Sequence, residues 1–345
     1  MSRSVLIARQ DSVGDVLLAG PALRAVAAGD TCVSLLCGPR GRPAAELLPG
    51  VSELIVWRAD WIDPEPHPLR RIHVEALVDD LAARGFEEAL ILTSFHQSPL
   101  PLALLLRMAG VPRIAAISED YPGSLLDLRV SVEEDIHEVQ RALAVAEACG
   151  YGLSAEDDRT LAIKRRGEIH PVAESLRPYV VVHPGASVPA RAWSASRNRE
   201  LVTLLTAAGQ NVVVTGSAGE RALTAAVCRE AVDGHVADLG GVTSLGELAE
   251  VIAGAEALVV GNTGPAHLAA AVGTPVVSLY APTVPASRWH PWRVPFEQLG
   301  RELPCAGCRA RTCPVPGHPC VDAITAEEVL RALSRLAPTR EEIAA

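Results

Sequence analysis

The stretch NTGPAHLAAAVGTPVV (residues 262–277) decides the fold, because it joins two apolar runs through a turn and an alanine-rich segment. The run ALVV (257–260) precedes it, and the run VVSLY (276–280) overlaps its end. Pro265 suits the first position of a helix, and Gly273 suits the cap that follows its last turn. The stretch therefore predicts a strand, a turn, a short helix and a second strand.

The start of this predicted helix is a candidate anion site. Its first N–H groups, at Gly264 and its neighbours, have no partner within the helix, and the hydroxyl of Thr263 comes directly before them. Such an end attracts anions through its free donors and its dipole. The alternative is a well-capped connection that binds nothing. His267, in the first turn, is either a ligand contact or a partly buried structural histidine.

Short apolar runs alternate with helical patterns along the chain, which predicts parallel sheets covered on both faces. The apolar runs of the first half are VLIA (5–8), TCVSLL (31–36), ELIVW (53–57), EALILT (88–93) and RIAAIS (113–118), and the helical patterns between them cover 16–28, 74–85 and 135–150. The pattern restarts with strands at 179–183, 211–216, 257–260 and 276–280, and with helices at 198–209, 220–232, 245–256 and 326–337. Two such blocks predict two doubly wound α/β domains, with a ligand between them at the carboxyl ends of the strands.

Between the two blocks, residues 151–178 are charged and contain proline, which indicates a linker with one edge strand. We place the domain boundary after residue 165, so that the domains cover 1–165 and 166–345. The second domain then includes a cysteine cluster and the C-terminal helix.

Composition excludes several classes of protein. The 345 residues are 49% hydrophobic and 21% charged, as in a packed globular protein, and two domains are the expectation at this length. The net charge of −10 argues against a nucleic-acid binder and against adsorption to anionic lipid. No apolar stretch has the length of a transmembrane span or a signal peptide. We therefore expect a cytoplasmic protein whose eight cysteines are mostly thiols or metal ligands.

Three further turns follow predicted strands and carry polar residues. Asp15 lies in RQDSVGDVLLAG (9–20), Ser187 and Arg191 lie in HPGASVPARAW (183–193), and Glu220 ends TGSAGE (215–220). Each has a plain structural reading: Asp15 as a helix N-cap, Arg191 as a solvated cation, and Glu220 as a complement to a helix dipole. Together they would bring a carboxylate and a cation to one cleft. None of the turns matches a Walker loop or a dinucleotide fingerprint.

Taken in order, SVGDVLLAGPALRAV (12–26), HPGASVPARAW (183–193), the Glu220 turn and GNTGPAHLAAAVGTPVVSLYAPT (261–283) resemble glycosyltransferase family 9, the bacterial ADP-heptose heptosyltransferases. The resemblance implies the GT-B architecture, two Rossmann-like domains that face each other across a cleft. It implies that the first domain binds the acceptor and that the second binds the nucleotide sugar. It also implies inverting transfer without a metal or cofactor, from a nucleoside diphosphate sugar to a glycan or glycolipid hydroxyl. The enzyme would work in the cytoplasm or at the inner face of the membrane.

The resemblance assigns roles residue by residue. Asp15 falls on the family's general base, and Glu220 on a ribose contact. Thr263 and Gly264 match backbone phosphate contacts, and Arg191 replaces the more usual diphosphate-binding lysine. The remaining donor-side candidates are Ser187, His267 and Asn262, where asparagine replaces the usual aspartate beside the donor sugar. An arginine can hold a diphosphate at least as well as a lysine.

The acceptor side is less well marked. The strand end TSFHQS (93–98) would lie at the cleft, and the acceptor-side candidates there are His96, Gln97 and Ser98. The loop 58–71 would cover them. These loops could equally be inert surface.

Half of the cysteines lie in CAGCRARTCPVPGHPC (305–320), at Cys305, Cys308, Cys313 and Cys320. Four thiolates suit one tetrahedral zinc or iron site with no open position, and hence a structural one. The alternatives are free thiols or redox disulfides. Similar clusters occur in some members of the family that the chain resembles.

Two other functions fit the same turns. A nucleotide-sugar 2-epimerase of GT-B shape would need further acid and base residues. A non-catalytic nucleotide-sugar-binding module would explain Asn262 but leaves Asp15 without a role.

Overall fold

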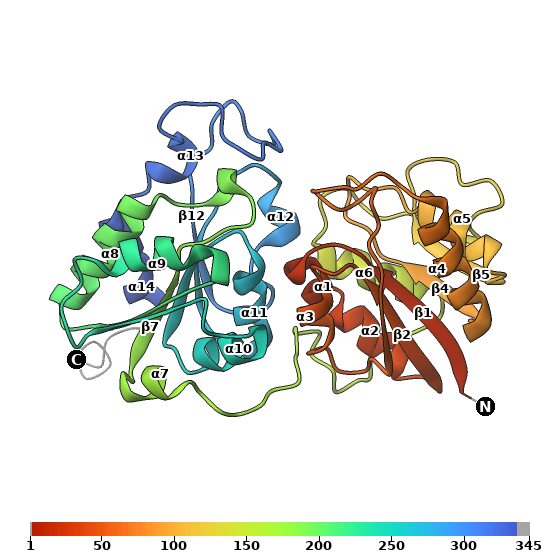
Figure 1. The fold of residues 1–345 in the computed structure, drawn as a ribbon, viewed down its shortest axis with the longest axis horizontal. Coiled ribbons are helices and arrows are strands. Elements are labelled where there is room, and N and C mark those ends of the chain that lie inside the picture. The colour runs from red at the N-terminus through yellow and green to blue at the C-terminus, as the bar shows by residue number, and fades with distance from the viewer. Residues whose placement is uncertain (1, 337–345) are drawn as a thin grey trace. The chain divides into compact units, whose positions relative to one another are not determined.

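The structure is a computed structural model that describes residues 2–336. It forms two compact units, Met1–Lys164 (unit 1) and Arg165–Ala345 (unit 2) (Figure 1). Each unit contains one six-stranded parallel sheet with helices on both faces. The division falls one residue before the boundary that we place from the sequence.

The sheet of unit 1 has the strand order β3-β2-β1-β4-β5-β6. Its strands are β1 (Arg3–Arg9), β2 (Thr31–Cys37), β3 (Glu53–Val56), β4 (Glu88–Ile91), β5 (Arg113–Ile117) and β6 (Leu128–Val130). Its helices are α1 (Val13–Leu18), α2 (Gly20–Ala27), α3 (Arg42–Ala45), α4 (Arg71–Arg84), α5 (Leu100–Met108) and α6 (Glu138–Ala148). In the central strand, Val5 pairs with Val33 on one side and with Glu88 on the other.

The core of unit 1 lies on both faces of this sheet. Leu6 and Ala8 of β1 join Leu81 of α4 and Leu106 of α5 in one buried cluster. The opposite face carries α1, α2 and α6, as Figure 1 shows. Because β1 is covered on both faces, all of its residues from Val5 onward are buried, and it appears in the sequence as an uninterrupted apolar run.

Unit 2 repeats this topology with the order β12-β11-β10-β7-β8-β9. Its strands are β7 (Tyr179–His183), β8 (Asn211–Gly216), β9 (Val236–Gly240), β10 (Ala257–Gly261), β11 (Val276–Leu279) and β12 (Phe296–Leu299). Its helices are α7 (Pro171–Ser175), α8 (Ala195–Ala207), α9 (Arg221–Cys228), α10 (Leu245–Ala253), α11 (Gly264–Val272), α12 (Ala286–Trp289), α13 (Pro319–Asp322) and α14 (Ala326–Leu336), with two 3₁₀ turns, η1 (Pro189–Arg191) and η2 (Ala218–Glu220). One buried cluster joins the sheet to α8, α9 and α14, and α10 and α11 lie on the other face (Figure 1).

Each sheet has one topological switch point, where the chain connections that follow two neighbouring strands run in opposite directions. It lies between β1 and β4 in unit 1 and between β7 and β10 in unit 2. In doubly wound sheets, ligands bind just beyond the carboxyl ends of the strands at this switch point. The loops that follow these four strands are therefore the places to look for a site.

Several predicted elements differ from those in the structure. The single helix expected over 16–28 is two helices, because Pro21 has no N–H to continue the ladder. The helix expected over 135–150 begins only at Glu138, where His137 forms a capping box with Gln140. The edge strand expected within 151–178 is wrong, since that segment contains only the short helix α7. Residue 337, the last of the helix expected over 326–337, lies outside the described residues.

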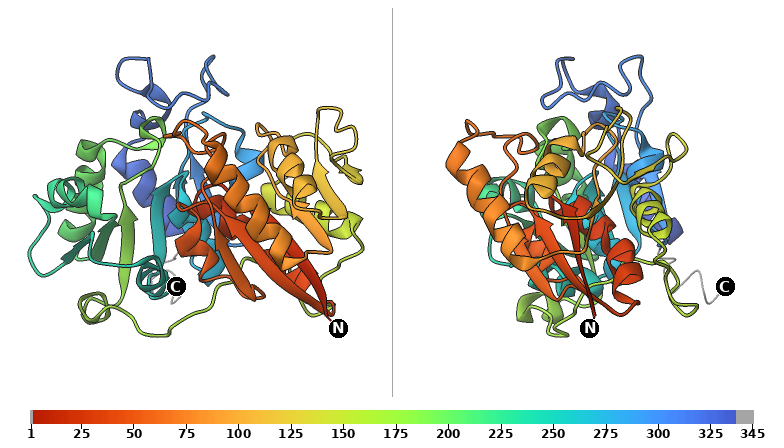
Figure 2. Two further views of the ribbon diagram at one scale, coloured as in Figure 1. Left: turned by 45° about the vertical axis from the view of Figure 1, so that its right-hand side comes forward. Right: turned by 90° about the vertical axis from the view of Figure 1, so that its right-hand side faces the viewer.

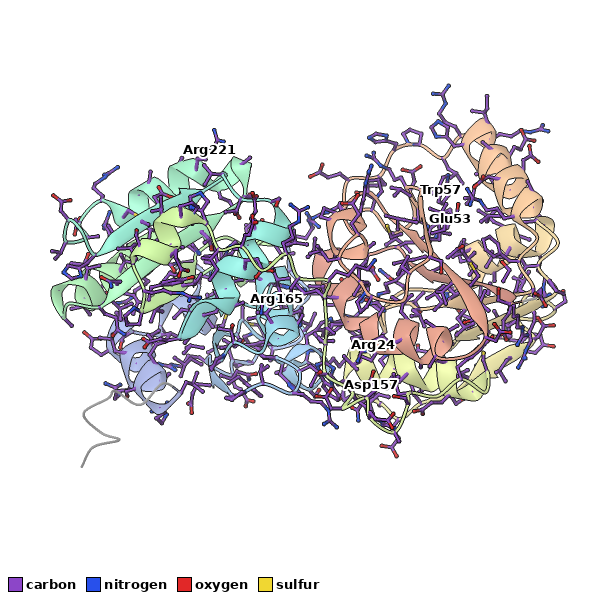
Figure 3. The ribbon with its side chains drawn as sticks, turned by 90° about the horizontal axis from the view of Figure 1, so that it is seen from below. Arg24, Glu53, Trp57, Asp157, Arg165 and Arg221 are labelled. Carbon is purple, nitrogen blue, oxygen red and sulfur yellow. The ribbon has the colours of Figure 1, made fainter. Side chains whose placement is uncertain are left out.

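The passage from one unit to the next is held closely on both sides. Arg24 of α2 forms two hydrogen bonds with the carboxylate of Asp157, and Figure 3 shows the two side chains meeting. The amide of Lys164 donates to the carbonyl of Leu47 in unit 1. The next residue, Arg165, forms a 2.5 Å ion pair with Glu250 of unit 2. The chain thus leaves one unit and enters the other within a single peptide bond.

Among residues 2–336, no helix has the length and apolar character needed to cross a membrane.

Candidate active site

Asp15 follows β1 at the switch point of unit 1. It is the third residue of α1, and Ser12 occupies the N-cap position before that helix. The reading of Asp15 as the N-cap is therefore wrong. Its Oδ2 accepts a hydrogen bond from the Ser12 hydroxyl at 2.8 Å, and its side chain is 19% exposed. Asp15 is thus a fixed carboxylate that solvent or a ligand can still reach.

Arg9, the last residue of β1, organises the carboxylates around Asp15. Its guanidinium is buried, with Nη2 at 3.1 Å from Asp15 Oδ1 and 3.3 Å from Glu138 Oε2. Nη2 also donates to the Ser94 hydroxyl at 2.9 Å, and Nε lies 2.9 Å from Asp11 Oδ2. One cation therefore joins four groups that come from distant parts of the chain.

The buried charges in this cluster have shifted pKa values. Burial by itself would lower the pKa of Arg9, but the three carboxylates together raise it, so the guanidinium stays charged. The pKa of Asp11 is raised to about 6, mainly by burial; the nearby Asp15 carboxylate adds to the rise, and the attraction of Arg9 opposes it. Burial also raises the pKa of Glu138, opposed by Arg9 and Arg141. The cluster carries more acid than base, because three carboxylates surround the Arg9 guanidinium.

The acceptor-side candidates lie after β4, in the same unit. The side-chain amide of Gln97 donates to Asp11, and its oxygen accepts from the amide of Ser94, so Gln97 joins the Arg9 cluster. His96 is exposed, with its ring edge-on to Phe95 at 5.2 Å. Ser98 is exposed, and its hydroxyl accepts from the amide of Leu100 at the start of α5. The structure therefore brings Gln97, but not Ser98, into contact with the residues around Asp15.

In unit 2, the segments after β7 and β10 meet at the switch point. Gly261, the last residue of β10, lies so close to the segment after β7 that a Cβ there would be 2.7 Å from the Arg191 carbonyl oxygen. A Cβ on Gly185, just after β7, would overlap the carboxylate of Glu220. Glycine at both positions allows three loops to pack closely at the carboxyl ends of β7, β8 and β10.

Arg191 ends the 3₁₀ turn η1, and its side chain is partly exposed. Its Nε donates to the Thr283 hydroxyl at 3.3 Å. Ser187, four residues earlier, is exposed. Arg191 is thus held on one edge of its guanidinium by a neutral hydroxyl.

The helix predicted from the opening stretch is α11, which begins at Gly264 and ends at Val272. Gly273 follows as its C-cap with φ 81°, the left-handed conformation of a glycine cap. Pro265 is its second residue rather than its first. Thr263 holds the N-cap position, but its side chain makes no cap hydrogen bond. The first N–H groups of α11 are therefore not occupied by the Thr263 side chain.

Asn262 lies just before this helix and is 4% exposed. Within residues 2–336, its buried Nδ2 finds no hydrogen-bond partner. A buried amide normally has a hydrogen-bond partner, so this donor is available to a water or ligand oxygen. His267, in the first turn of α11, is buried.

Glu220 has a structural role of its own. Its Oε2 accepts from the amide of Ser217 at 2.7 Å, which closes a capping box at the start of η2 and α9.

His183, at the end of β7, is buried and bonds through Nδ1 to the Thr215 hydroxyl at 3.0 Å. Burial lowers the pKa of His183 to about 4, although Glu220 acts in the opposite direction. His183 is therefore neutral at physiological pH.

Comparison with known proteins adds to this geometry. The sequence model described as "Glycosyltransferase family 9 (heptosyltransferase)" matches residues 75–318. The chain belongs to glycosyltransferase family 9. A curated relative, lipopolysaccharide heptosyltransferase 1 of Pseudomonas aeruginosa, is 31% identical over 225 residues, which are 63% of this chain and 61% of the relative. The match thus covers less than two thirds of that relative's length.

Solved structures share the family 9 fold. ADP-heptose LPS heptosyltransferase II of Escherichia coli has a TM-score of 0.75 and 21% identity, over 99% of this chain and 100% of that one. TibC of enterotoxigenic Escherichia coli, an iron-containing dodecameric glycosyltransferase, has a TM-score of 0.55 and 14% identity, over 97% and 76%. These likenesses confirm the predicted fold class, the two Rossmann-like units of the GT-B architecture.

Some residues of the cluster around Asp15 were not predicted from the resemblance to family 9. Arg9 and Glu138 were not predicted, although they lie at the centre of the Asp15 cluster. The signal for Arg9 was a charged residue directly after the apolar run of a buried strand. Glu138 lies 129 residues after Arg9 in the sequence, and only the packing of α6 brings the two side chains together.

The four predicted metal ligands line one pocket of unit 2. Its lining includes Cys305, Cys308, Cys313, Cys320 and His318, around about 380 Å³ of empty space that is partly open to solvent. All eight cysteines lie within the described residues, and each is a free thiol. Burial raises the pKa of Cys320, and the neighbouring Cys313 and Cys305 raise it further. Four cysteine thiolates are a ligand set that suits zinc or iron. Within residues 2–336, however, no three His, Cys, Asp or Glu side chains are arranged so that they could hold a metal ion.

Proposed function

We propose that this chain is an inverting glycosyltransferase that moves a heptose or a similar sugar from an ADP-linked donor to a hydroxyl of a glycan or glycolipid. Membership of family 9 and the curated heptosyltransferase relatives support the choice of sugar. The observation that carries the mechanism is Asp15: a partly exposed carboxylate, oriented by a buried arginine, at the switch point of unit 1.

In this reaction Asp15 removes the proton of the acceptor hydroxyl. The acceptor oxygen forms its bond to the anomeric carbon from the face opposite the diphosphate, and the bond from that carbon to the diphosphate oxygen breaks. The proton ends on Asp15, and the electron pair leaves with the nucleoside diphosphate. Because Arg9 and Ser12 hold the carboxylate, Asp15 needs little reorganisation to accept the proton.

We assign the donor to unit 2. The partly exposed guanidinium of Arg191 would neutralise the diphosphate, and the first N–H groups of α11, at Thr263 and Gly264, would bind its oxygens. The unpaired amide of Asn262 would donate to a sugar or phosphate oxygen. Glu220 is the candidate for the ribose hydroxyls, with Oε1 free of the bond that Oε2 makes to Ser217. Ser187 and His267 stay candidates for contacts with the same donor.

We assign the acceptor to unit 1. Gln97 lies in the Asp15 cluster, and His96 is exposed nearby in sequence, so both suit contacts with acceptor hydroxyls. Ser98 stays a weaker candidate, because its hydroxyl already accepts from Leu100. A glycolipid acceptor would place the reaction in the cytoplasm, at the inner face of the membrane.

We also propose that the four cysteines hold one zinc or iron ion. Cys305, Cys308, Cys313 and Cys320 would be its ligands, and the ion would stabilise an exposed loop that has little core of its own. Four thiolates leave no open position, so the ion would take no part in the transfer.

The test is turnover of ADP-heptose with and without a lipopolysaccharide-type acceptor. We expect ADP release that depends on the acceptor, and a product whose anomeric configuration, read by NMR, is opposite to that of the donor. Conversion of the sugar without an acceptor would favour the epimerase. Binding of the donor without any turnover would favour a non-catalytic module.

A further inference from the structure

The cysteine-rich segment, residues 304–320 (the cysteine loop), bonds directly to the turn that carries Arg191. The amide of Ala190 donates to the carbonyl of Arg311 at 3.0 Å. The carbonyl of Ala190 accepts from Nε2 of His318 at 3.1 Å. Both backbone groups of the residue before Arg191 therefore bond to the cysteine loop.

The cysteine loop also bonds to the residue that holds the Arg191 side chain. The amide of Gly307 donates to the Pro282 carbonyl at 2.7 Å, and the amide of Arg309 donates to the Thr283 carbonyl at 3.0 Å. The Thr283 hydroxyl in turn accepts from Nε of Arg191 at 3.3 Å. The residue before Arg191 and the residue that holds the Arg191 side chain are thus both bonded to the same loop.

Two of the residues that make these bonds have strained backbones. Arg309 has φ 52° and His318 has φ 45°, in the left-handed region that side chains other than glycine rarely adopt. Such conformations persist where surrounding contacts fix them, and they gather at functional positions. The strain here lies at two of the points where the loop meets the donor side of unit 2.

At its C-terminal end the loop is anchored by Cys320, which is buried in the core of unit 2. It is mostly exposed and has no helix or strand before α13, and Figure 2 shows it as the blue segment that extends away from the rest of unit 2. Its four thiols share a pocket with Ala190 and Thr283. The packing of the thiols and the placement of Arg191 are therefore features of one small structure.

We propose that the cysteine loop is a positioning element of the donor site, which holds Arg191 in place for a nucleoside diphosphate. A change to the pocket that the four thiols line frees the Ala190 turn and weakens diphosphate binding, although the loop itself need not touch the ligand. The proposal rests on the assignment of Arg191 to the donor site.

The test uses the full chain and two variants. Cys305→Ser/Cys308→Ser alters two exposed thiols outside the core. His318→Gly removes the ring that bonds to Ala190, while glycine keeps the left-handed backbone without strain. Cys228→Ser, in α9 of the same unit, is the control. The measurements are the Kd for ADP by calorimetry and the hydrogen exchange of the Ala190 and Arg191 amides.

For His318→Gly we expect ADP affinity to fall about 3- to 10-fold, the range of one lost hydrogen bond. The double cysteine variant should lose more, on the order of tenfold or above. In both variants the Ala190 and Arg191 amides should exchange faster, while the amides of β7 and β10 stay protected as in the control.

Unchanged exchange at Ala190 and Arg191, with ADP affinity within twofold of the wild type in both variants, would overturn the proposal. If the wild type does not bind ADP at all, the donor assignment fails, and the exchange data still decide whether the loop holds the turn. If the double cysteine variant does not fold, His318→Gly carries the test.

Discussion

Nη2 of Arg9 lies 3.1 Å from Oδ1 of Asp15, and the same nitrogen lies 3.3 Å from Glu138. One buried guanidinium thus links the end of β1, the first turn of α1 and the start of α6. In the proposed reaction Arg9 would orient Asp15 and would take no part in the proton transfer itself.

Asp15→Asn should separate catalysis from folding. Asparagine keeps the size of the side chain and can still bond to Arg9 or Ser12, but it cannot accept the proton of an acceptor hydroxyl. We expect turnover to fall by about 10² to 10⁴, the usual contribution of a general base, while the melting temperature and ADP affinity stay close to those of the wild type. Retained turnover would show that the base lies elsewhere.

Arg9→Lys keeps the charge but loses the fork that reaches Asp11, Asp15 and Glu138 together. We expect kcat to fall roughly tenfold, because the loss of one hydrogen bond that orients Asp15 raises the activation free energy by about 1.4 kcal/mol. The KM for the nucleotide sugar should stay unchanged. Arg113→Lys is the matched control, since Arg113 pairs with buried Glu88 at the other end of the sheet. Equal losses in both variants would indicate a purely structural role for Arg9.

Arg191→Ala should remove most of the stabilisation that ADP gives to the protein. A ligand that binds only the native state raises its melting temperature by mass action, so lost affinity appears as a smaller thermal shift. Arg199→Ala removes the same charge from unit 2 at an exposed ion pair with Glu230 and should keep the full shift. An equal ADP shift in Arg191→Ala and wild type would remove Arg191 from the donor site.

The cysteine cluster should carry metal when the protein is purified without added metal. Elemental analysis is expected to give about one zinc or iron per chain, as for a single four-thiolate site. Cys305→Ser/Cys308→Ser should lose the metal and melt at a lower temperature. A metal-free chain with four titratable thiols in this segment and full stability would contradict the site.

His183 should make unit 2 less stable in mild acid. Its pKa is lowered to about 4 in the folded protein, so as pH falls through the ordinary value near 6.5 the unfolded chain takes up a proton that the folded chain does not. The resulting loss begins below about pH 6.5 and levels off near pH 4.

We expect the free energy of unfolding of the wild type to fall by about 2 kcal/mol relative to His183→Asn between pH 7 and pH 5. Denaturant titrations at the two pH values measure the difference. The comparison with the variant is needed because Asp11, with its raised pKa, acts in the opposite direction: it stabilises the fold as pH falls through about 6. A pH-independent difference between the two proteins would show that His183 is not held neutral.

The sequence predicted the interior strands well and the sheet edges poorly. Interior strands such as β7 and β10 are buried on both faces and appear as unbroken apolar runs. The three missed strands, β6, β9 and β12, all lie at sheet edges. Polar residues such as Asp238 in β9 and Gln298 in β12 interrupt their apolar pattern, and β6 has only three residues. An edge strand owes its conformation to its one neighbour, which local sequence does not reveal.

The same distinction holds for the candidate site. The turns with Asp15, Arg191 and Thr263 could be predicted because they follow interior strands whose ends the sequence marks. The contacts around these residues could not, since packing brings Glu138 to Arg9 across 129 residues of sequence and Thr283 to Arg191 across 92. Local patterns locate the loops at a switch point, and tertiary contacts decide what each side chain meets.

The tightly held passage between the units has a practical consequence for dissecting the protein. Lys164 is anchored to unit 1, whereas Arg165 pairs with Glu250, which is 1% exposed, and the amide of Arg166 bonds to the same carboxylate. A fragment of unit 2 that starts even a few residues later would leave the buried Glu250 carboxylate without its cation and without the amide of Arg166. A recombinant unit 2 should therefore begin at Arg165, directly after the peptide bond that divides the two units.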